Sequence, residues 1–307
     1  MPPDLLVLAD DLTGALEVGA KLRAVVGFDL PAQVIDTETR HVPPPEAAAR
    51  VRSLLAKAVR PRIFKKTDST LQGNIGAELA ALSEAYPGET IHYIPAYPDM
   101  GRIVRQGHLY VHGVRVPNGS VRAVVGDLPN VVIHDAETDD EVAAALCQAG
   151  RIVCGPACIA DYLAPAAPAV LPAIRSCVVV NGSLQETSAR QIDHAVERGW
   201  RVVEAAGLAG AMKESCWVIL RVEHARINAA AICDILTEAA PDALAVFGGD
   251  TVYAIVQALG EQVIAPVAEL LPGVPISRLK NMYLITKAGG FGPKQVLTEI
   301  RCSLESR

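Results

Sequence analysis

The stretch Leu-Leu-Val-Leu-Ala-Asp-Asp-Leu-Thr-Gly, residues 5–14, indicates the fold class near the beginning of the chain. Its first five residues are all apolar, and a short continuous apolar run is typical of a strand that is buried on both faces. Asp10 and Asp11 end this run, and a helical pattern then opens at Thr13 and continues to Val26. A buried strand followed at once by a helix predicts an α/β domain with a mostly parallel sheet.

The same alternation of strand and helix continues along the first half of the chain. Further strands are predicted at 34–35, 62–66, 91–94, 131–133 and 151–153, and further helices at 46–59, 73–86 and 139–149. Residues 107–125 are different, because an alternating pattern broken by Pro117-Asn118-Gly119 predicts antiparallel strands there.

An alanine- and proline-rich segment divides the chain. Residues 163–172 read LAPAAPAVLP, with three prolines in ten residues, which is typical of a linker. The alternation then restarts, with strands predicted at 177–180, 217–222, 244–247 and 283–286 and helices at 187–198, 227–239, 251–259 and 294–304. We therefore predict two α/β domains, residues 1–165 and 172–307, each with a mostly parallel sheet flanked by helices.

The composition excludes several classes of protein. Of the 307 residues, 50% are hydrophobic and 20% charged, so the chain can bury a large core and is not expected to be disordered. No apolar stretch reaches the ~18 residues of a membrane span, and the N-terminus lacks the basic region of a secretory signal. A net charge of −6 argues against a general nucleic-acid binder. The seven cysteines include no C-x-x-C motif and predict buried thiols of a cytoplasmic protein.

Two adjacent carboxylates stand where the first strand ends. Loops at the carboxyl ends of parallel strands bind the ligands of α/β folds, so Asp10 and Asp11 are candidates for a general base, a binder of substrate hydroxyls or an Mg²⁺ ligand. The alternative is a helix N-cap, a position that Asp fills well. One Asp is enough for a cap, so the pair favours a site.

A cationic polar loop, KKTDSTLQGN at residues 65–74, follows another predicted strand. Lysine side chains and the free N–H groups of a helix start can together hold a carboxylate or a phosphate; the alternative is a solvated, capped turn. A stiff turn at residues 95–102 ends in Arg102, which is suited to bind a carboxylate through two parallel hydrogen bonds. The alternative for Arg102 is a surface arginine.

Three loops of the second half are rich in small residues. They are Asn181-Gly182-Ser183, Gly248-Gly249-Asp250-Thr251 and the KAGGFG stretch at 287–292. Glycine lets a ligand approach the backbone closely, and successive backbone N–H groups bind phosphate, so these loops predict a nucleotide site; tight turns are the alternative. Walker-type, Rossmann and protein-kinase motifs are missing from the sequence.

Taken together, these residues resemble the four-carbon acid sugar kinase family, which includes threonate, erythronate and 3-oxo-tetronate kinases. The resembling stretches follow the family order across nearly the whole chain: ADDLTGA (9–15), IDTETR (35–40), KTDSTLQGNIGAE (66–78), IPAYPDMGRIVRQGHLYVHG (94–113), NGSLQETSARQI (181–192), FGGDTVYAIVQALG (247–260), PGVPISRL (272–279) and LITKAGGFG (284–292). One position departs from the family pattern D-S-T-L-R-G-N, because Gln72 stands where the family has arginine.

The resemblance implies an N-terminal sugar-acid domain, a C-terminal ATP domain and an active site in the cleft between them, where phosphate passes from ATP to the terminal hydroxyl of a four-carbon sugar acid with the help of Mg²⁺. On this interpretation Asp11 is the general base. The substrate-binding candidates are Asp10, Lys66, Asp68, Ser69, Gln72 and Arg102, and the nucleotide-binding candidates are Ser183, Gly248, Gly249, Asp250, Thr251, Gly289, Gly290, Phe291 and Gly292. The metal ligands stay unassigned. The expected partners are a sugar acid and ATP, with neither nucleic acid nor membrane, and a homodimer is left open.

Two other classes of function stay open on the sequence alone. Gln72, and the short segment between the first helix and residue 35, also fit a non-catalytic relative that binds a sugar acid or a nucleotide without turnover. An isomerase or aldolase acting on sugar acids is the third possibility. Product formation that depends on ATP separates the kinase from both.

Overall fold

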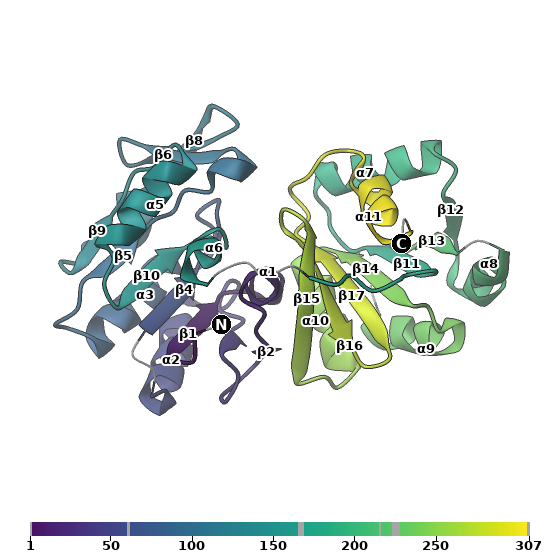
Figure 1. The fold of residues 1–307 in the computed structure, drawn as a ribbon, viewed down its shortest axis with the longest axis horizontal. Helices are drawn as coiled ribbons and strands as arrows, with labels where there is room; N and C mark the ends of the chain where they lie inside the picture. The colour runs from purple at the N-terminus through teal and green to yellow at the C-terminus, as the bar shows by residue number, and fades with distance from the viewer. Residues whose placement is uncertain (1, 60–61, 165–168, 215, 223–227, 306–307) are drawn as a thin grey trace. The chain divides into compact units, whose positions relative to one another are not determined.

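A computed structural model describes residues 2–59, 62–164, 169–214, 216–222 and 228–305 of the chain. The chain folds as two compact units, Met1–Ala167 and Pro168–Arg307. The linker predicted at 163–172 falls in the same part of the chain, but its residues 165–168 lie outside the described residues. Each unit contains its own mostly parallel sheet flanked by helices (Figure 1), and this confirms the predicted α/β class.

The sheet of the first unit is parallel throughout, in the order β2-β3-β1-β4-β10-β5-β9. Its strands are β1 (Leu5–Ala9), β2 (Val26–Gly27), β3 (Val34–Asp36), β4 (Arg62–Lys66), β5 (Ile91–Tyr93), β9 (Val131–Ile133) and β10 (Ile152–Gly155). β1 lies between β3 and β4 and is buried along its whole length, as its apolar sequence predicts. The carboxyl ends of β3, β1 and β4 therefore meet at one edge of the sheet.

Two groups of helices flank this sheet (Figure 1). One group is α2 (Pro44–Lys57), α3 (Ile75–Ala85) and α4 (Val121–Val125), and the other is α1 (Leu12–Leu22), α5 (Asp139–Gln148) and α6 (Ile159–Leu163). A separate antiparallel sheet contains β6 (Arg102–Arg105), β7 (His108–Val111) and β8 (Val114–Ser120). The prediction of antiparallel strands was wrong for residues 121–125, because Ser120 caps the helix α4 there by accepting a hydrogen bond from the Ala123 N–H.

The sheet of the second unit has the order β12-β13-β11-β14-β17-β16-β15, parallel from β12 to β17 and antiparallel beyond. Its strands are β11 (Cys177–Asn181), β12 (Arg201–Val203), β13 (Trp217–Leu220), β14 (Ala243–Phe247), β15 (Val263–Leu271), β16 (Val274–Leu279) and β17 (Met282–Lys287). The sequence did not indicate β15 and β16, because Pro266, Pro272 and Pro275 read as loop. The structure accommodates Pro266 and Pro275 in an antiparallel pair whose register shifts twice, and Pro272 lies in the turn between the two strands.

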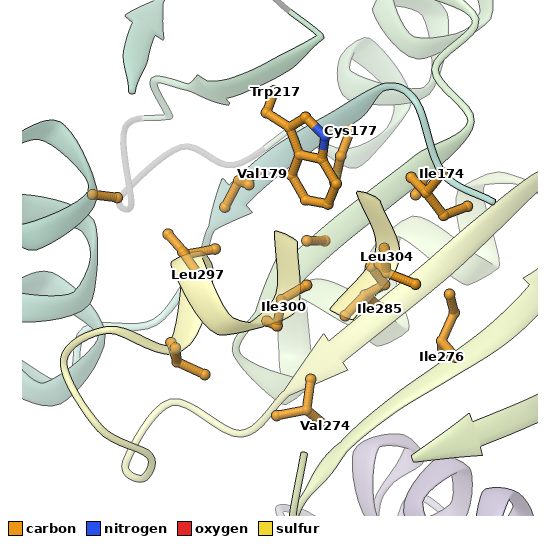
Figure 2. Packing of buried hydrophobic residues seen from close by; sticks show 14 of the residues in the cluster. Ile174, Cys177, Val179, Trp217, Val274, Ile276, Ile285, Leu297, Ile300 and Leu304 are labelled. Carbon is orange, nitrogen blue, oxygen red and sulfur yellow. The ribbon is translucent and has the colours of Figure 1, made fainter. Parts of the chain in front are cut away.

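The helices of the second unit pack in pairs. α7 (Glu186–Glu197) contacts α11 (Val296–Glu305), and α9 (Ala229–Ala239) contacts α10 (Gly249–Ala258) and α8 (Leu208–Glu214). Figure 2 shows how Leu297, Ile300 and Leu304 of α11 pack in the same buried cluster as Ile285 and Trp217 of the sheet. This core fixes the strands whose ends bear the glycine-rich loops.

No described helix is long and apolar enough to span a membrane.

Candidate functional site

Asp10 and Asp11 lie where β1 passes into α1, as predicted, but they have different surroundings. Asp10 is 1% exposed. Asp11 is partly buried and caps α1, its Oδ1 accepting a hydrogen bond of 3.0 Å from the Gly14 N–H. The N-cap interpretation of Asp11 is therefore correct. A cap uses one face of one oxygen, so it does not remove Asp11 from a catalytic role.

Arg40 joins the two carboxylates, and sequence reasoning had not selected it as a site residue. Its Nε donates to Asp10 Oδ2 at 2.8 Å, and its two terminal nitrogens donate to Asp11 Oδ2 at 2.7 Å and Asp11 Oδ1 at 2.9 Å. A third carboxylate, that of Asp68, lies 3.7 Å from the guanidinium. Arg40 follows β3, which pairs with β1, and the backbone N–H of Arg40 donates to the Asp10 carbonyl. The available signal was an arginine four residues beyond a strand end, in a motif that the family resemblance already included.

Lys66, at the end of β4, completes the cluster from the other side of β1. Its Nζ lies 3.6 Å from Asp10 Oδ1, and its side chain is 6% exposed. A Cβ atom added to Gly14 would overlap this ammonium group and would lie 2.7 Å from Asp11 Oδ1. Gly14 is thus the residue that lets Lys66 reach the start of α1.

The loop after β4 orients Asp68. One oxygen of its carboxylate, Oδ1, accepts hydrogen bonds from the Thr70 N–H at 2.7 Å, the Thr70 hydroxyl at 2.6 Å and the Gln72 N–H at 3.2 Å. The Gln72 side chain itself is exposed. Because Oδ1 is occupied by the loop, Oδ2 is the oxygen that faces Arg40.

Ser69 and Arg102 form a second polar pair in the same unit. The Arg102 guanidinium donates to Ser69 Oγ at 2.7 Å, so the turn predicted at 95–102 does bring Arg102 to the loop after β4. Arg102 is partly buried, and burial lowers its pKa although the charge of Asp68 opposes this effect. The alternative of a surface arginine is therefore wrong, because Arg102 is partly buried.

The charges at this edge of the sheet stabilise one another. Burial alone would raise the pKa of Asp10, but the positive charges of Arg40, Lys66 and Lys65 hold that pKa far below its usual value. Burial alone would lower the pKa of Lys66, and the carboxylates of Asp10 and Asp11 outweigh it, so the pKa is raised. Asp10 is therefore a carboxylate and Lys66 an ammonium group across the physiological pH range.

A second, fully buried layer lies beneath this cluster. Lys65 pairs with Glu78 of α3 at 3.0 Å, and the Thr39 hydroxyl donates to the same Glu78 oxygen. Burial raises the pKa of Glu78, although Lys65 opposes this effect. Nearby, burial and the charge of Glu38 raise the pKa of Asp36 at the end of β3. None of these residues was among the site residues that the sequence predicted.

The second unit brings three loops together. They follow β11, β14 and β17, which are neighbouring parallel strands, so their carboxyl ends lie side by side. A Cβ atom added to Gly182 would overlap Thr251, and one added to Gly289 would overlap Ser183. A Cβ atom on Gly248, whose φ of +109° already favours glycine, would lie 3.1 Å from the Ser183 nitrogen. The small residues are therefore required by this close packing of the loops.

The predicted nucleotide residues occupy distinct places in this arrangement. Gly249 and Asp250 open α10, so the helix presents its free N–H groups at the loops. Gly290 has no described atom within 4 Å of the position its Cβ would take. The carbonyls of Phe291 and Gly292 accept hydrogen bonds from Gln191. The loops are therefore closely packed against one another at Gly182, Gly248 and Gly289 but have open space at Gly290. Such an arrangement suits an anion that binds backbone N–H groups.

The described residues contain no group of three or more His, Cys, Asp or Glu side chains arranged to hold a metal ion. Magnesium in phosphoryl-transfer enzymes needs little more than one or two carboxylates, because the phosphates supply further ligands. Asp250, exposed in the first turn of α10, is a carboxylate placed among the glycine loops. Asp250 therefore fits the role of a protein ligand to an Mg²⁺ ion that arrives with a nucleotide.

Fold and candidate sites together define a two-unit α/β protein with a cluster of charged side chains in one unit and glycine-rich loops in the other. Comparison with known families agrees: a sugar-binding N-terminal domain matches residues 5–212, and a nucleotide-binding C-terminal domain matches residues 219–297. The chain belongs to the four-carbon acid sugar kinase family, which confirms the resemblance. The first match extends beyond residue 167, although β11 pairs with strands of the second unit.

Two curated relatives align with nearly the whole chain, and a third aligns with part of it. A D-threonate kinase of Bordetella bronchiseptica is 28% identical over 99% of this chain and 98% of its own length, and one of Salmonella typhimurium is 24% identical over 96% and 97%. The Salmonella alignment occupies 410 positions, so that relative has segments that this 307-residue chain lacks. A D-erythronate kinase of Heliobacterium modesticaldum is 31% identical over 46% of this chain and 36% of its own length.

Two crystal structures share the fold. A Salmonella typhimurium LT2 protein matches 96% of this chain and 98% of its own with a TM-score of 0.75 at 19% identity. A Haemophilus influenzae protein matches 97% and 99% with a TM-score of 0.67 at 18% identity.

Proposed function

We propose that this protein is a kinase that transfers the γ-phosphoryl group of ATP to the terminal hydroxyl of a four-carbon sugar acid of the threonate or erythronate type. The observation that carries the proposal is that, in a chain of this family, the two units contain different kinds of polar site. One unit gathers buried, mutually paired carboxylates and cations at a strand edge, and the other gathers glycine loops with a helix N-terminus.

The charged cluster supplies what a small polyhydroxylated acid requires. Lys66 and Arg102 are the cations suited to the carboxylate of the acid, and the carboxylates of Asp10 and Asp68 are acceptors for its hydroxyl groups. Arg40 already makes a fork of hydrogen bonds to Asp10 and Asp11, so we assign it the task of orienting these carboxylates.

The reaction requires little covalent help from the protein. The substrate hydroxyl oxygen forms a bond to the γ-phosphorus, the bond from that phosphorus to the β,γ-bridging oxygen breaks, and ADP leaves. The hydroxyl proton passes to Asp11, the second residue after the end of β1. Mg²⁺, when bound with the nucleotide, neutralises phosphate charge, and Asp250 is its candidate protein ligand.

The test is ADP release by the purified full-length protein with MgATP and a panel of four-carbon acids that includes D-threonate and D-erythronate. We expect at least one acid to stimulate ADP release well above the rate with ATP alone. If no acid on the panel stimulates ADP release while ADP still binds, the protein is a non-catalytic relative instead. Conversion of an acid without ATP would favour the isomerase or aldolase interpretation.

A further inference from the structure

Lys287, the last residue of β17, is a lysine buried within the loops of the second unit. Its side chain is 0% exposed. The Nζ atom donates hydrogen bonds to the carbonyls of Ala288 at 2.7 Å, Phe291 at 3.0 Å and Gly289 at 3.4 Å. The aromatic rings of Phe247 and Phe291 lie against the same atom, with their centroids 4.6 Å and 5.2 Å away.

Two side chains of α7 bind the same loop from the same unit. The Ser188 hydroxyl donates to the Gly289 carbonyl at 2.8 Å, and Gln191 Nε2 lies 3.1 Å from each of the carbonyls of Phe291, Gly292 and Pro293. Between residues 288 and 293, five carbonyls therefore accept hydrogen bonds from Lys287, Ser188 or Gln191.

This arrangement determines where the N–H groups of the loop point. In a trans peptide the C=O of one residue and the N–H of the next point in opposite directions. When the carbonyls of Ala288, Gly289 and Phe291 turn toward Lys287, the N–H groups of Gly289, Gly290 and Gly292 turn away from it. All three of these residues are glycine, and none of their N–H groups donates to another residue in the described part of the chain.

We propose that Lys287 is a positioning residue of the nucleotide site, which holds the carbonyls of Ala288, Gly289 and Phe291 inward so that the N–H groups of Gly289, Gly290 and Gly292 bind the phosphate oxygens of a nucleoside di- or triphosphate. The inference rests on the proposed function, since it assumes that these loops bind nucleotide. Lys287 does not itself contact the phosphates, because its side chain is enclosed by the carbonyls and rings that it contacts.

The chemistry of the side chain fits this task. An ammonium group has three N–H donors, and three carbonyls lie around it. Burial lowers the pKa of Lys287 to about 7. A buried cation is a poor means of stabilising a fold, because removing it from water is costly, whereas an apolar side chain of similar size fills the same space without that cost. The presence of lysine here is therefore better explained by the order of the loop than by stability.

The test compares three full-length proteins: the wild type, Lys287→Met and the control Lys213→Met, which changes an exposed lysine of α8 in the same unit. Each is titrated calorimetrically with ADP and with adenosine, and its melting temperature is recorded. We expect Lys287→Met to weaken ADP binding by at least about tenfold and adenosine binding by less than about twofold, because only the phosphates use the loop. Lys213→Met should leave both unchanged.

Unchanged ADP affinity in Lys287→Met would overturn the inference, and so would an equal loss of ADP and adenosine, which would indicate a general structural defect. If Lys287→Met does not fold, Ser188→Ala takes its place: it removes one hydrogen bond to the Gly289 carbonyl and should weaken ADP binding by about threefold, and no change would overturn the inference. A wild-type protein that binds neither ligand would instead contradict the proposed function, and with it the basis of the inference.

Discussion

The two units achieve the same result, a polar site at the carboxyl ends of parallel strands, by opposite means. The first unit uses charged side chains: Asp10 and Lys66 are buried and Arg40 is partly buried, each against a partner of opposite charge. The second unit uses the backbone: a Cβ atom on Gly182 or Gly289 would overlap a neighbouring side chain, and Gly248 has a φ of +109° that favours glycine. The first site therefore depends on charge balance, and the second on close packing of the main chain.

The largest expected effect comes from the carboxylate assigned as the base. Asp11→Asn keeps an oxygen that caps α1, but an amide cannot accept the hydroxyl proton. We expect kcat to fall by roughly 10²–10⁴ while the fold is retained, as is usual for loss of a general base. Steady-state ADP release checks this, with Asp161→Asn, which changes an exposed acid of the same unit, as the control. If Asp10→Asn loses kcat and Asp11→Asn does not, the two roles are exchanged.

The next effect concerns charge balance. Arg40→Met removes the guanidinium from three carboxylates and should lower the free energy of unfolding by about 3–5 kcal/mol, as for other buried pairs that lose one partner. Arg52→Met removes an exposed arginine from its pair with Glu84 and should cost about 0–1 kcal/mol. Urea denaturation measures both changes. Equal values for the two variants would show that the cluster is not held together by Arg40.

The backbone site should respond to bulk rather than to charge. Gly290→Val places a side chain in the open space where we expect phosphate, so ADP binding should weaken by about tenfold, or ~1.4 kcal/mol, with little change in melting temperature. Gly210→Val is the matched control, since Gly210 also has open space around it and lies in α8. Sugar-acid binding should be the same in both variants. An ADP affinity that survives Gly290→Val would place the phosphates elsewhere.

The smallest effect is a pH dependence of stability from Lys287. Its pKa is lowered by burial to about 7 in the folded protein from 10.5, so between these values the unfolded chain binds more protons. Stability of the wild type should therefore rise with pH in this window, by on the order of 1 kcal/mol per pH unit, relative to Lys287→Met. Denaturation of both proteins at pH 7.5 and pH 8.5 measures the difference. If the difference in free energy of unfolding between the two proteins does not change with pH, the Lys287 ammonium group is not desolvated in the folded protein.

Much of this architecture could be predicted because it is local in sequence. The apolar run of β1 predicts a buried strand, and Asp10, Asp11 and Lys66 follow strand ends at which ligands bind in parallel sheets. Arg40 escaped selection because its role depends on β3 pairing with β1 in the register Val7 to Val34, a contact that no local pattern reveals.

The remaining omissions have related physical causes. Lys287 stands in a motif noted for its glycines, and a lysine at a strand end is ordinarily expected in solvent, so its complete burial could not be predicted. The burial of Lys65 and Glu78 is possible because the two form an ion pair with each other. They lie in β4 and α3, so their pairing could not be seen in a local sequence pattern. Strands β15 and β16 were hidden by their prolines, which antiparallel pairing at shifts in register accommodates.

The most direct test of the proposed function is phosphorus NMR of a reaction that contains the full-length protein, MgATP and the acid that best stimulates ADP release. A kinase predicts that the γ-phosphate signal of ATP is replaced in equal amount by a phosphate monoester on the terminal carbon of the acid, together with ADP. The appearance of inorganic phosphate alone, or of no new phosphorus signal for any four-carbon acid, would contradict it.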